Sequence, residues 1–186
     1  MRLKRSFFAR PTLQVARALL GQRLVRVYHG ERLSGLITEC EAYIGEDDSA
    51  CHAAHGRTAR TAVMYGAAGH AYVYFTYGMH WMLNAITERE GFPAAVLIRA
   101  IAPQEGIETM RCLRGREPLA DGPAKLCQAL ALDKTFNGID IITHEELFIE
   151  RAQPIADSQV QLSPRVGINS AAKVDRERLW RFVVKD

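Results

Sequence analysis

A segment rich in proton-carrying groups, TECEAYIGEDDSACHAAHGRTAR, occupies residues 38–60. Its first part is expected to be a strand, in which alternate side chains share a face, so Ile37, Glu39, Glu41 and Tyr43 should lie together. Two carboxylates beside a tyrosine make a poor core face, and something polar should lie against them. A carboxylate held among apolar and aromatic groups has a raised proton affinity, which suits a general base acting on water. The segment indicates a hydrolytic centre, with an exposed strand face paired to arginines as the alternative.

Three chemistries compete for this segment. Paired carboxylates could cleave a glycosidic bond, although that geometry needs groups on opposite sides of a cleft rather than neighbours on one strand. A metal ion could bind among Asp47, Asp48, His52 and His55. Their spacing matches no closed zinc pattern, so we expect no metal. In the third chemistry Glu41 acts alone as the base, and aromatic residues hold a planar substrate.

A second unusual segment, YVYFTYG at residues 72–78, carries Tyr72, Tyr74 and Tyr77. Strand alternation places Tyr72 and Tyr74 on one side and puts Tyr77 on the other side or at a turn. A buried tyrosine needs a partner for its hydroxyl group, so the three rings should not all serve as core. The segment favours a site that stacks on a planar ligand.

The elements that would position these residues are mostly short strands. Residues 22–28 and 32–43 should form a hairpin, and later strands are expected at 147–151, 165–168 and 180–184. AYVYFTYG and MHWMLNAIT read as two strands joined near Gly78, and AAVLIRAI reads as a buried strand that contains Arg99. Helices are expected from Thr12, as the N-cap, to just before Gly21, and within 103–114 and 122–132. This pattern predicts an α+β protein: a single compact domain over residues 1–186 with a mostly antiparallel, curved sheet and flanking helices. A long loop from Ile44 to about His70 is a candidate functional segment.

Composition limits the other classes. The chain has 186 residues, of which 48% are hydrophobic and 24% charged, and this balance is typical of a globular protein rather than a disordered one. No apolar run is long enough to cross a membrane, and no secretory signal core follows the basic N-terminus, so we expect a cytoplasmic protein with no membrane partner. The four cysteines form no CxxC pair, which suits a reducing compartment.

The net charge of +3 is unevenly distributed. Seven Lys or Arg residues and no acid lie between residues 1 and 28, and further basic clusters occur at Arg57 and Arg60, at RCLRGR and at RERLWR. Such faces either bind phosphates in a salt-dependent way or are simply solvated surface.

Several long motifs together resemble one known family. ECEAYIGEDDSACHAAHGRTART, VMYGAAGHAYVYFTYGMHWMLN, AAVLIRAIAPQEG, DGPAKLCQAL and SPRVGI occur in the order found in methylpurine (3-methyladenine, alkyladenine) DNA glycosylases. The resemblance runs from about Phe8 to Phe182. It implies a glycosylase of base excision repair that acts on double-stranded DNA containing damaged purines. It implies no cofactor, and we expect a monomer.

The resemblance also implies a role for individual residues. Glu41, in the EAY motif, would activate the attacking water, and Arg99 would lie near that water and the DNA backbone. Tyr43 would stack on one face of an extruded base, with His52 on the opposite face. Tyr74 would form the second aromatic wall.

Two more positions complete the predicted site. Tyr77 would insert into the duplex where the base has left, and Asn84 would crowd the exocyclic amino group of normal guanine. Tyr72 matches no role, and core packing is expected for it. Glu39 stays a candidate supporting carboxylate.

One expectation comes from the residues alone. A glycosylase that also cuts the backbone commonly uses an amine to form a Schiff base, yet no lysine occurs from Arg5 to Ala124. The chain should therefore leave an abasic site uncut. The alternatives are a non-catalytic binder of lesion DNA and a metal-dependent phosphodiesterase that uses Asp47, Asp48 and His52.

Overall fold

Strand β2 (Glu31–Ile44) is the centre of an eight-stranded antiparallel sheet, and it has neighbours on both sides. The computed structural model describes residues 1–185. The main path of the sheet is β3-β4-β5-β2-β1-β6, and β8 pairs with both β2 and β7. The other strands are β1 (Arg23–Tyr28), β3 (Ala71–Thr76), β4 (His80–Ile86), β5 (Ala94–Glu105), β6 (Leu147–Glu150), β7 (Val160–Ser163) and β8 (Arg181–Val184).

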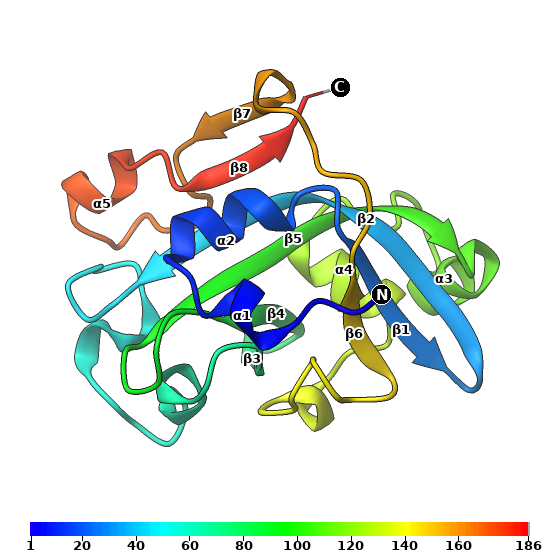
Figure 1. Cartoon of the computed structure of the whole chain (residues 1–186), viewed down its shortest axis with the longest axis horizontal. Coiled ribbons are helices and arrows are strands. Elements are labelled where there is room, and N and C mark those ends of the chain that lie inside the picture. Colours follow the sequence, from blue (N-terminus) through cyan, green and yellow to red (C-terminus); the bar gives the residue numbers. More distant parts are fainter. Residues whose placement is uncertain (186) are drawn as a thin grey trace.

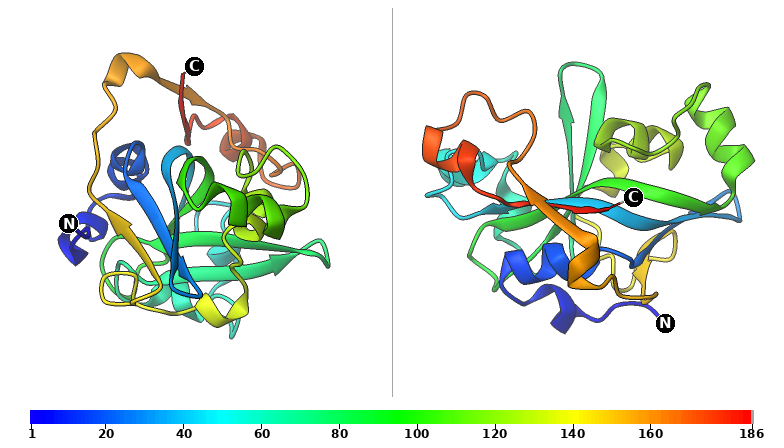
Figure 2. Two further views of the ribbon diagram at one scale, coloured as in Figure 1. Left: turned by 90° about the vertical axis from the view of Figure 1, so that its right-hand side faces the viewer. Right: turned by 90° about the horizontal axis from the view of Figure 1, so that it is seen from above.

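The helices are short and cover both faces of the central strands. Figure 2 (right) shows α1 and α2 on one side of β2 and β5, and α3 and α4 on the other. The α-helices are α1 (Arg5–Phe8), α2 (Thr12–Leu19), α3 (Ile107–Arg114), α4 (Pro123–Ala129) and α5 (Lys173–Glu177). Four 3-10 turns complete the set: η1 (His52–His55), η2 (Ala62–Tyr65), η3 (Lys134–Phe136) and η4 (Asp157–Gln159). The predicted α+β class and antiparallel sheet are confirmed. No helix among residues 1–185 is long and apolar enough to span a membrane.

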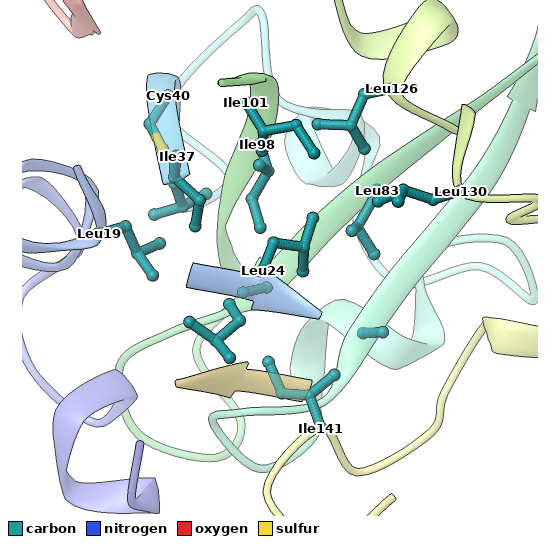
Figure 3. Close-up of a cluster of buried hydrophobic side chains, with 14 of the residues drawn as sticks. Leu19, Leu24, Ile37, Cys40, Leu83, Ile98, Ile101, Leu126, Leu130 and Ile141 are labelled. Atoms are coloured by element: carbon teal, nitrogen blue, oxygen red, sulfur yellow. The ribbon is translucent and has the colours of Figure 1, made fainter. Parts of the chain in front are cut away.

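The hydrophobic core lies where the central strands meet the helices. Figure 3 shows its side chains, which come from α2, β1, β2, β4, β5, α4 and the loop near residue 141. Fully buried leucines and isoleucines such as Leu19, Leu24 and Ile98 each contribute about 1.5–3 kcal/mol through removal of apolar surface from water. This core holds β2 and β5 rigidly beneath the loops that follow them.

A bulge in β2 changes which residues share a face. The pairing of β2 with β5 shifts between Ile37 and Glu39 and again between Glu39 and Cys40. Ile37 therefore packs in the core together with Cys40 and Ala42, as Figure 3 shows for Ile37 and Cys40. Glu39, Glu41 and Tyr43 lie on the opposite face, without Ile37. The predicted face was wrong at that one position, because an inserted residue reverses strand alternation.

Two other local predictions were wrong. Thr12 is the first residue of α2 and Pro11 is the N-cap, since Glu88 caps the helix from another element by accepting hydrogen bonds from the Thr12 N–H and hydroxyl groups. Residues 165–168, expected as a strand, form part of an irregular segment after β7. That segment reaches the candidate site instead of the sheet.

Candidate active site

A cleft of about 590 Å³ opens where the loop after β2, the β3–β4 hairpin and the segment 166–171 converge. In Figure 1 these parts are the cyan loop, the strands marked β3 and β4, and the orange chain that leads into α5. Six of the seven predicted site residues line the cleft: Tyr43, His52, Tyr74, Tyr77, Asn84 and Arg99. The seventh, Glu41, is fully buried and lies directly behind this lining.

Three cleft-lining groups hold the Glu41 carboxylate. Its Oε1 accepts a hydrogen bond of 2.7 Å from the Val166 backbone N–H, and its Oε2 accepts one of 2.8 Å from the Tyr43 hydroxyl group. Arg99 Nη1 lies 3.3 Å from Oε2. Burial raises the pKa of Glu41, against the opposing effects of Arg99, Val166 and Tyr43. A carboxylate with this environment has the increased proton affinity that a general base needs.

Arg99 projects from β5 and is shared between two carboxylates. Its Nε donates to Glu39 Oε1 over 2.5 Å, while its Nη1 faces Glu41. Arg181 of β8 donates to the same Glu39 oxygen over 2.6 Å. Glu39 is thus mostly buried and ion-paired, which agrees with neither an exposed strand face nor a second group across a cleft.

The aromatic wall of the cleft comes from β3 and η1. The ring centroids of Tyr72 and Tyr74 are 5.3 Å apart, so strand alternation correctly placed them on one side. The His52 ring meets Tyr74 edge-on at 4.4 Å, and its Nδ1 lies 3.0 Å from the Tyr72 hydroxyl group. Tyr72 is buried, as expected, and its hydroxyl group lies at the lining of the cleft beside His52. Burial, with a smaller effect of Arg60, lowers the pKa of His52 to about 4, so the imidazole is neutral at pH 7.

The tip of the β3–β4 hairpin projects Tyr77 into solvent. Tyr77 is 75% exposed and has a φ of 52°, and Gly78 follows with a φ of 67°. Positive φ at both positions is typical of tight hairpin turns, but tyrosine rarely adopts it. Backbone strain at an exposed aromatic tip is a feature of functional surfaces.

Asn84 has a fixed orientation at the floor of the cleft. It lies on β4, is nearly fully buried, and its Nδ2 donates a 3.0 Å hydrogen bond to the Tyr72 carbonyl oxygen. Its side chain therefore cannot turn freely to accommodate a ligand.

Asp48, one of the residues weighed above as a possible metal ligand, is used elsewhere in the fold. Asp48 is fully buried and forms a two-point ion pair with Arg165, over 2.6 and 2.8 Å. Within the described part of the chain, no group of three or more His, Cys, Asp or Glu side chains could hold a metal ion.

The segment after β7 contributes to the site in a way that the sequence did not predict. Arg165 is fully buried, donates to the Ala42 carbonyl oxygen and lies over the Tyr43 ring, 4.8 Å from its centroid. The next residue, Val166, contacts Glu41. The SPRVGI motif identified this segment in the sequence, but it did not indicate that the segment folds back onto β2.

Many arginines of the candidate basic faces form ion pairs with acidic residues of the same protein. Arg5, Arg17 and Arg26 pair with Asp140, Asp157 and Glu146. In RERLWR, Arg178 pairs with Asp175 and Arg181 with Glu39. By contrast, Arg60 is exposed at the cleft, with its guanidinium 5.5 Å from the Tyr74 ring centroid. Of these clusters, the one at Arg57 and Arg60 is best placed to meet a ligand.

Comparison with known proteins gives a consistent result. The profile of a family described as methylpurine-DNA glycosylase matches residues 6–186. A protein of Methanocella arvoryzae is 47% identical over 188 residues, covering 99% of this chain and 92% of the relative. One of Carboxydothermus hydrogenoformans is 45% identical over 189 residues, covering 100% and 96%. A third, of Myxococcus xanthus, is 46% identical over 180 residues, covering 96% and 89%. All three are described as "putative 3-methyladenine DNA glycosylase".

Proposed function

Because the chain belongs to the methylpurine-DNA glycosylase family, we propose that it excises alkylated and deaminated purines from duplex DNA by a Glu41-activated water. As a member of this family it is a DNA glycosylase, a hydrolase of N-glycosyl bonds. The substrates we propose are 3-methyladenine, 7-methylguanine, hypoxanthine and ethenoadenine. The observation that carries the mechanism is the position of Glu41, buried directly behind an aromatic cleft and held by Tyr43, Arg99 and Val166.

The damaged base enters the cleft by rotating out of the duplex. Tyr43 on one side, and Tyr74 with His52 on the other, offer faces on which a purine can stack. Base–aromatic stacking contributes about 1–3 kcal/mol per base, and it tolerates the varied shapes of damaged purines. Extrusion costs a few kcal/mol, and less for a damaged or mispaired base, so flipping itself adds selectivity. Tyr77, exposed at the hairpin tip, fills the gap left in the stack. Asn84 disfavours normal guanine.

The chemical step breaks the bond between C1′ and the purine nitrogen. Glu41 Oε2 accepts a proton from water that enters between Tyr43 and Arg99, and the water oxygen forms the new bond to C1′. The electron pair of the broken bond leaves with the base. 3-Methyladenine and 7-methylguanine are already cationic in DNA and depart as neutral molecules, whereas the neutral lesions hypoxanthine and ethenoadenine take up a proton from solvent as they leave. The main tasks are then to supply water and to stabilise an oxocarbenium-like transition state. The Glu41 carboxylate serves both.

The product we propose is an uncut abasic site. No lysine is among the described residues that line the cleft, and Lys125, the first lysine after the lysine-free stretch from Arg5 to Ala124, forms an ion pair with Asp121 over 2.8 Å. None of the residues described at the cleft therefore supplies an amine that could form a Schiff base with the sugar. Borohydride treatment during turnover should trap no covalent protein–DNA complex, and a trapped complex would contradict this part of the proposal.

The decisive experiment measures free base released from methylated duplex DNA in EDTA. The wild type should release methylpurine. Glu41→Gln, which keeps the side-chain shape but has no basic oxygen, should lower the single-turnover rate by about two to four orders of magnitude, as loss of a general base does. Glu146→Gln removes an exposed carboxylate outside the cleft and serves as the matched control.

Binding measurements separate the remaining outcomes. Lesion DNA should bind the wild type and Glu41→Gln with similar affinity. Binding without release by either protein would indicate a non-catalytic lesion binder. Backbone cleavage that appears only on addition of a divalent metal would indicate a phosphodiesterase.

A further inference from the structure

The strands on both sides of β2 supply an arginine to the same carboxylate. Glu39 and Glu41 lie on one face of β2, with β5 on one side and β8 on the other. Glu39 Oε1 accepts from Arg99 Nε at 2.5 Å and from Arg181 Nε at 2.6 Å. Arg181 is also directly opposite Glu41 in the pairing of β2 with β8. The four side chains form a continuous ionic chain from Arg181 through Glu39 and Arg99 to Glu41.

Arg99 contacts both carboxylates through different nitrogen atoms of its guanidinium group. Its Nε is bound to Glu39, and only Nη1, 3.3 Å from Oε2, is left for Glu41. Arg181 neutralises Glu39 from the other side, so that Arg99 is not required to do so alone. Arg181 is itself held, because its Nη1 lies 3.2 Å from Ser163 Oγ on β7.

The charges within the ionic chain balance. Two carboxylates and two guanidinium groups give a net charge of zero around a fully buried Glu41. The titratable and charged groups that face Glu41 come from β2, β3, β5, β8 and the segment after β7: Glu39, Tyr43, Tyr74, Arg99, Arg181 and Arg165. Arg165 is committed to Asp48. The charge of Arg181 consequently determines whether the net charge of the ionic chain is zero or negative.

We propose that Arg181 is a positioning residue of the glycosylase, which neutralises Glu39 so that Arg99 remains available to keep Glu41 ionised near neutral pH. The inference rests on the proposed role of Glu41 as the base. Arg181 touches neither the substrate nor the attacking water. It acts through Glu39, which it shares with Arg99.

Two substitutions should move the proton affinity of Glu41 in opposite directions. Arg181→Gln gives the ionic chain a net negative charge. The uncompensated carboxylate of Glu39 should then shift the midpoint of the acid limb of the pH–rate profile, where Glu41 becomes protonated, upward by about 0.5–1 pH unit. At a pH well below that limb, the single-turnover rate should therefore fall about three- to tenfold. Glu39→Gln leaves a net positive chain and should lower the limb by a similar amount, while its amide oxygen can still accept from both arginines.

The controls separate this role from general charge loss and from instability. Arg176→Gln removes an exposed cation from α5 and should leave the acid limb unchanged. Arg181→Lys keeps the charge without the planar guanidinium and should give an acid limb between those of the wild type and Arg181→Gln. The affinity of Arg181→Gln for lesion DNA should match that of Arg176→Gln.

The test pairs the pH–rate profile with direct titration of Glu41, observed by NMR of the ¹³C-labelled carboxyl carbon in DNA-free protein. Opposite shifts for Arg181→Gln and Glu39→Gln in both measurements support the inference. Equal loss of rate at every pH, or shifts of the same sign, overturns it. If Arg181→Gln does not fold, Arg181→Lys decides the question: an acid limb above that of the wild type supports the inference, and an unchanged limb overturns it. Opposite NMR shifts in a protein that releases no base would leave the ionic chain intact and refute the proposed function instead.

Discussion

The buried ion pair between Asp48 and Arg165 should be one of the most costly interactions to break in this molecule. Both side chains are fully buried, and Asp48 accepts hydrogen bonds of 2.6 and 2.8 Å from the guanidinium group. It also accepts from the backbone N–H groups of Ile44 and Ala50. Asp48→Asn keeps the shape but leaves the Arg165 charge without a counterion. Removing one partner of a buried pair costs about 3–5 kcal/mol.

The magnitude can be tested by thermal unfolding. In a domain of this size each kcal/mol corresponds to about 2–4 °C, so Asp48→Asn should lower Tm by about 6–20 °C. The matched control is Asp157→Asn, which breaks a 2.6 Å contact with Arg17 at a side chain that is 96% exposed. An exposed pair contributes at most about 1 kcal/mol, so this Tm should fall by no more than about 4 °C. Equal shifts in the two variants would refute the argument that burial determines the cost.

Three further predictions concern the cleft. Burial raises the pKa of Glu41 in the folded state, so its contribution to stability is complete below the unfolded pKa and is lost as pH rises through the folded pKa. The wild type should therefore lose free energy of unfolding as pH rises from 4 to 8, and Glu41→Gln should not lose this part. Urea unfolding of both proteins across that range checks the sign of the difference. His52, with a pKa of about 4, should show no ring titration by NMR between pH 5.5 and 8, and Arg60→Ala should raise its midpoint. Tyr77→Ala should leave Tm within about 1 °C, since the ring is exposed. It should slow base release from duplex DNA more than from single-stranded DNA, and an equal effect on both would argue against insertion into the stack.

Local sequence patterns identified the strands and the aromatic wall well. The spacing of Tyr72 and Tyr74 follows the two-residue period of a strand, and Gly78 marks the turn, so these features depend only on neighbours in sequence. The face that carries Glu39 and Glu41 was also predicted. Ile37 was misplaced because a bulge has no clear signature in one sequence.

Long-range partners were much harder to predict. Arg181 was grouped with Arg176 and Arg178 as surface charge, yet Arg181 is paired with Glu39, 142 positions away along the chain. Composition does not reveal whether an arginine meets water or a buried carboxylate, because that depends on which strand is placed beside which. The cap of α2 was wrong for the same reason, since Glu88 supplies it from a distant turn.

The return of β8 to β2 has a consequence for how the protein acquires activity. Glu41 and Arg99 are synthesised early, but the segment with Arg165 and Val166, and then Arg181, must follow before their contacts can form. Pairings this distant in sequence carry a large loop-closure cost and tend to form late in folding. A nascent or truncated polypeptide that ends before β8 would contain every residue of the aromatic cleft but would lack Arg181, the member of the ionic chain that β8 supplies. Under the proposed mechanism, the ionic chain behind Glu41 is therefore complete only after β8 has paired with β2.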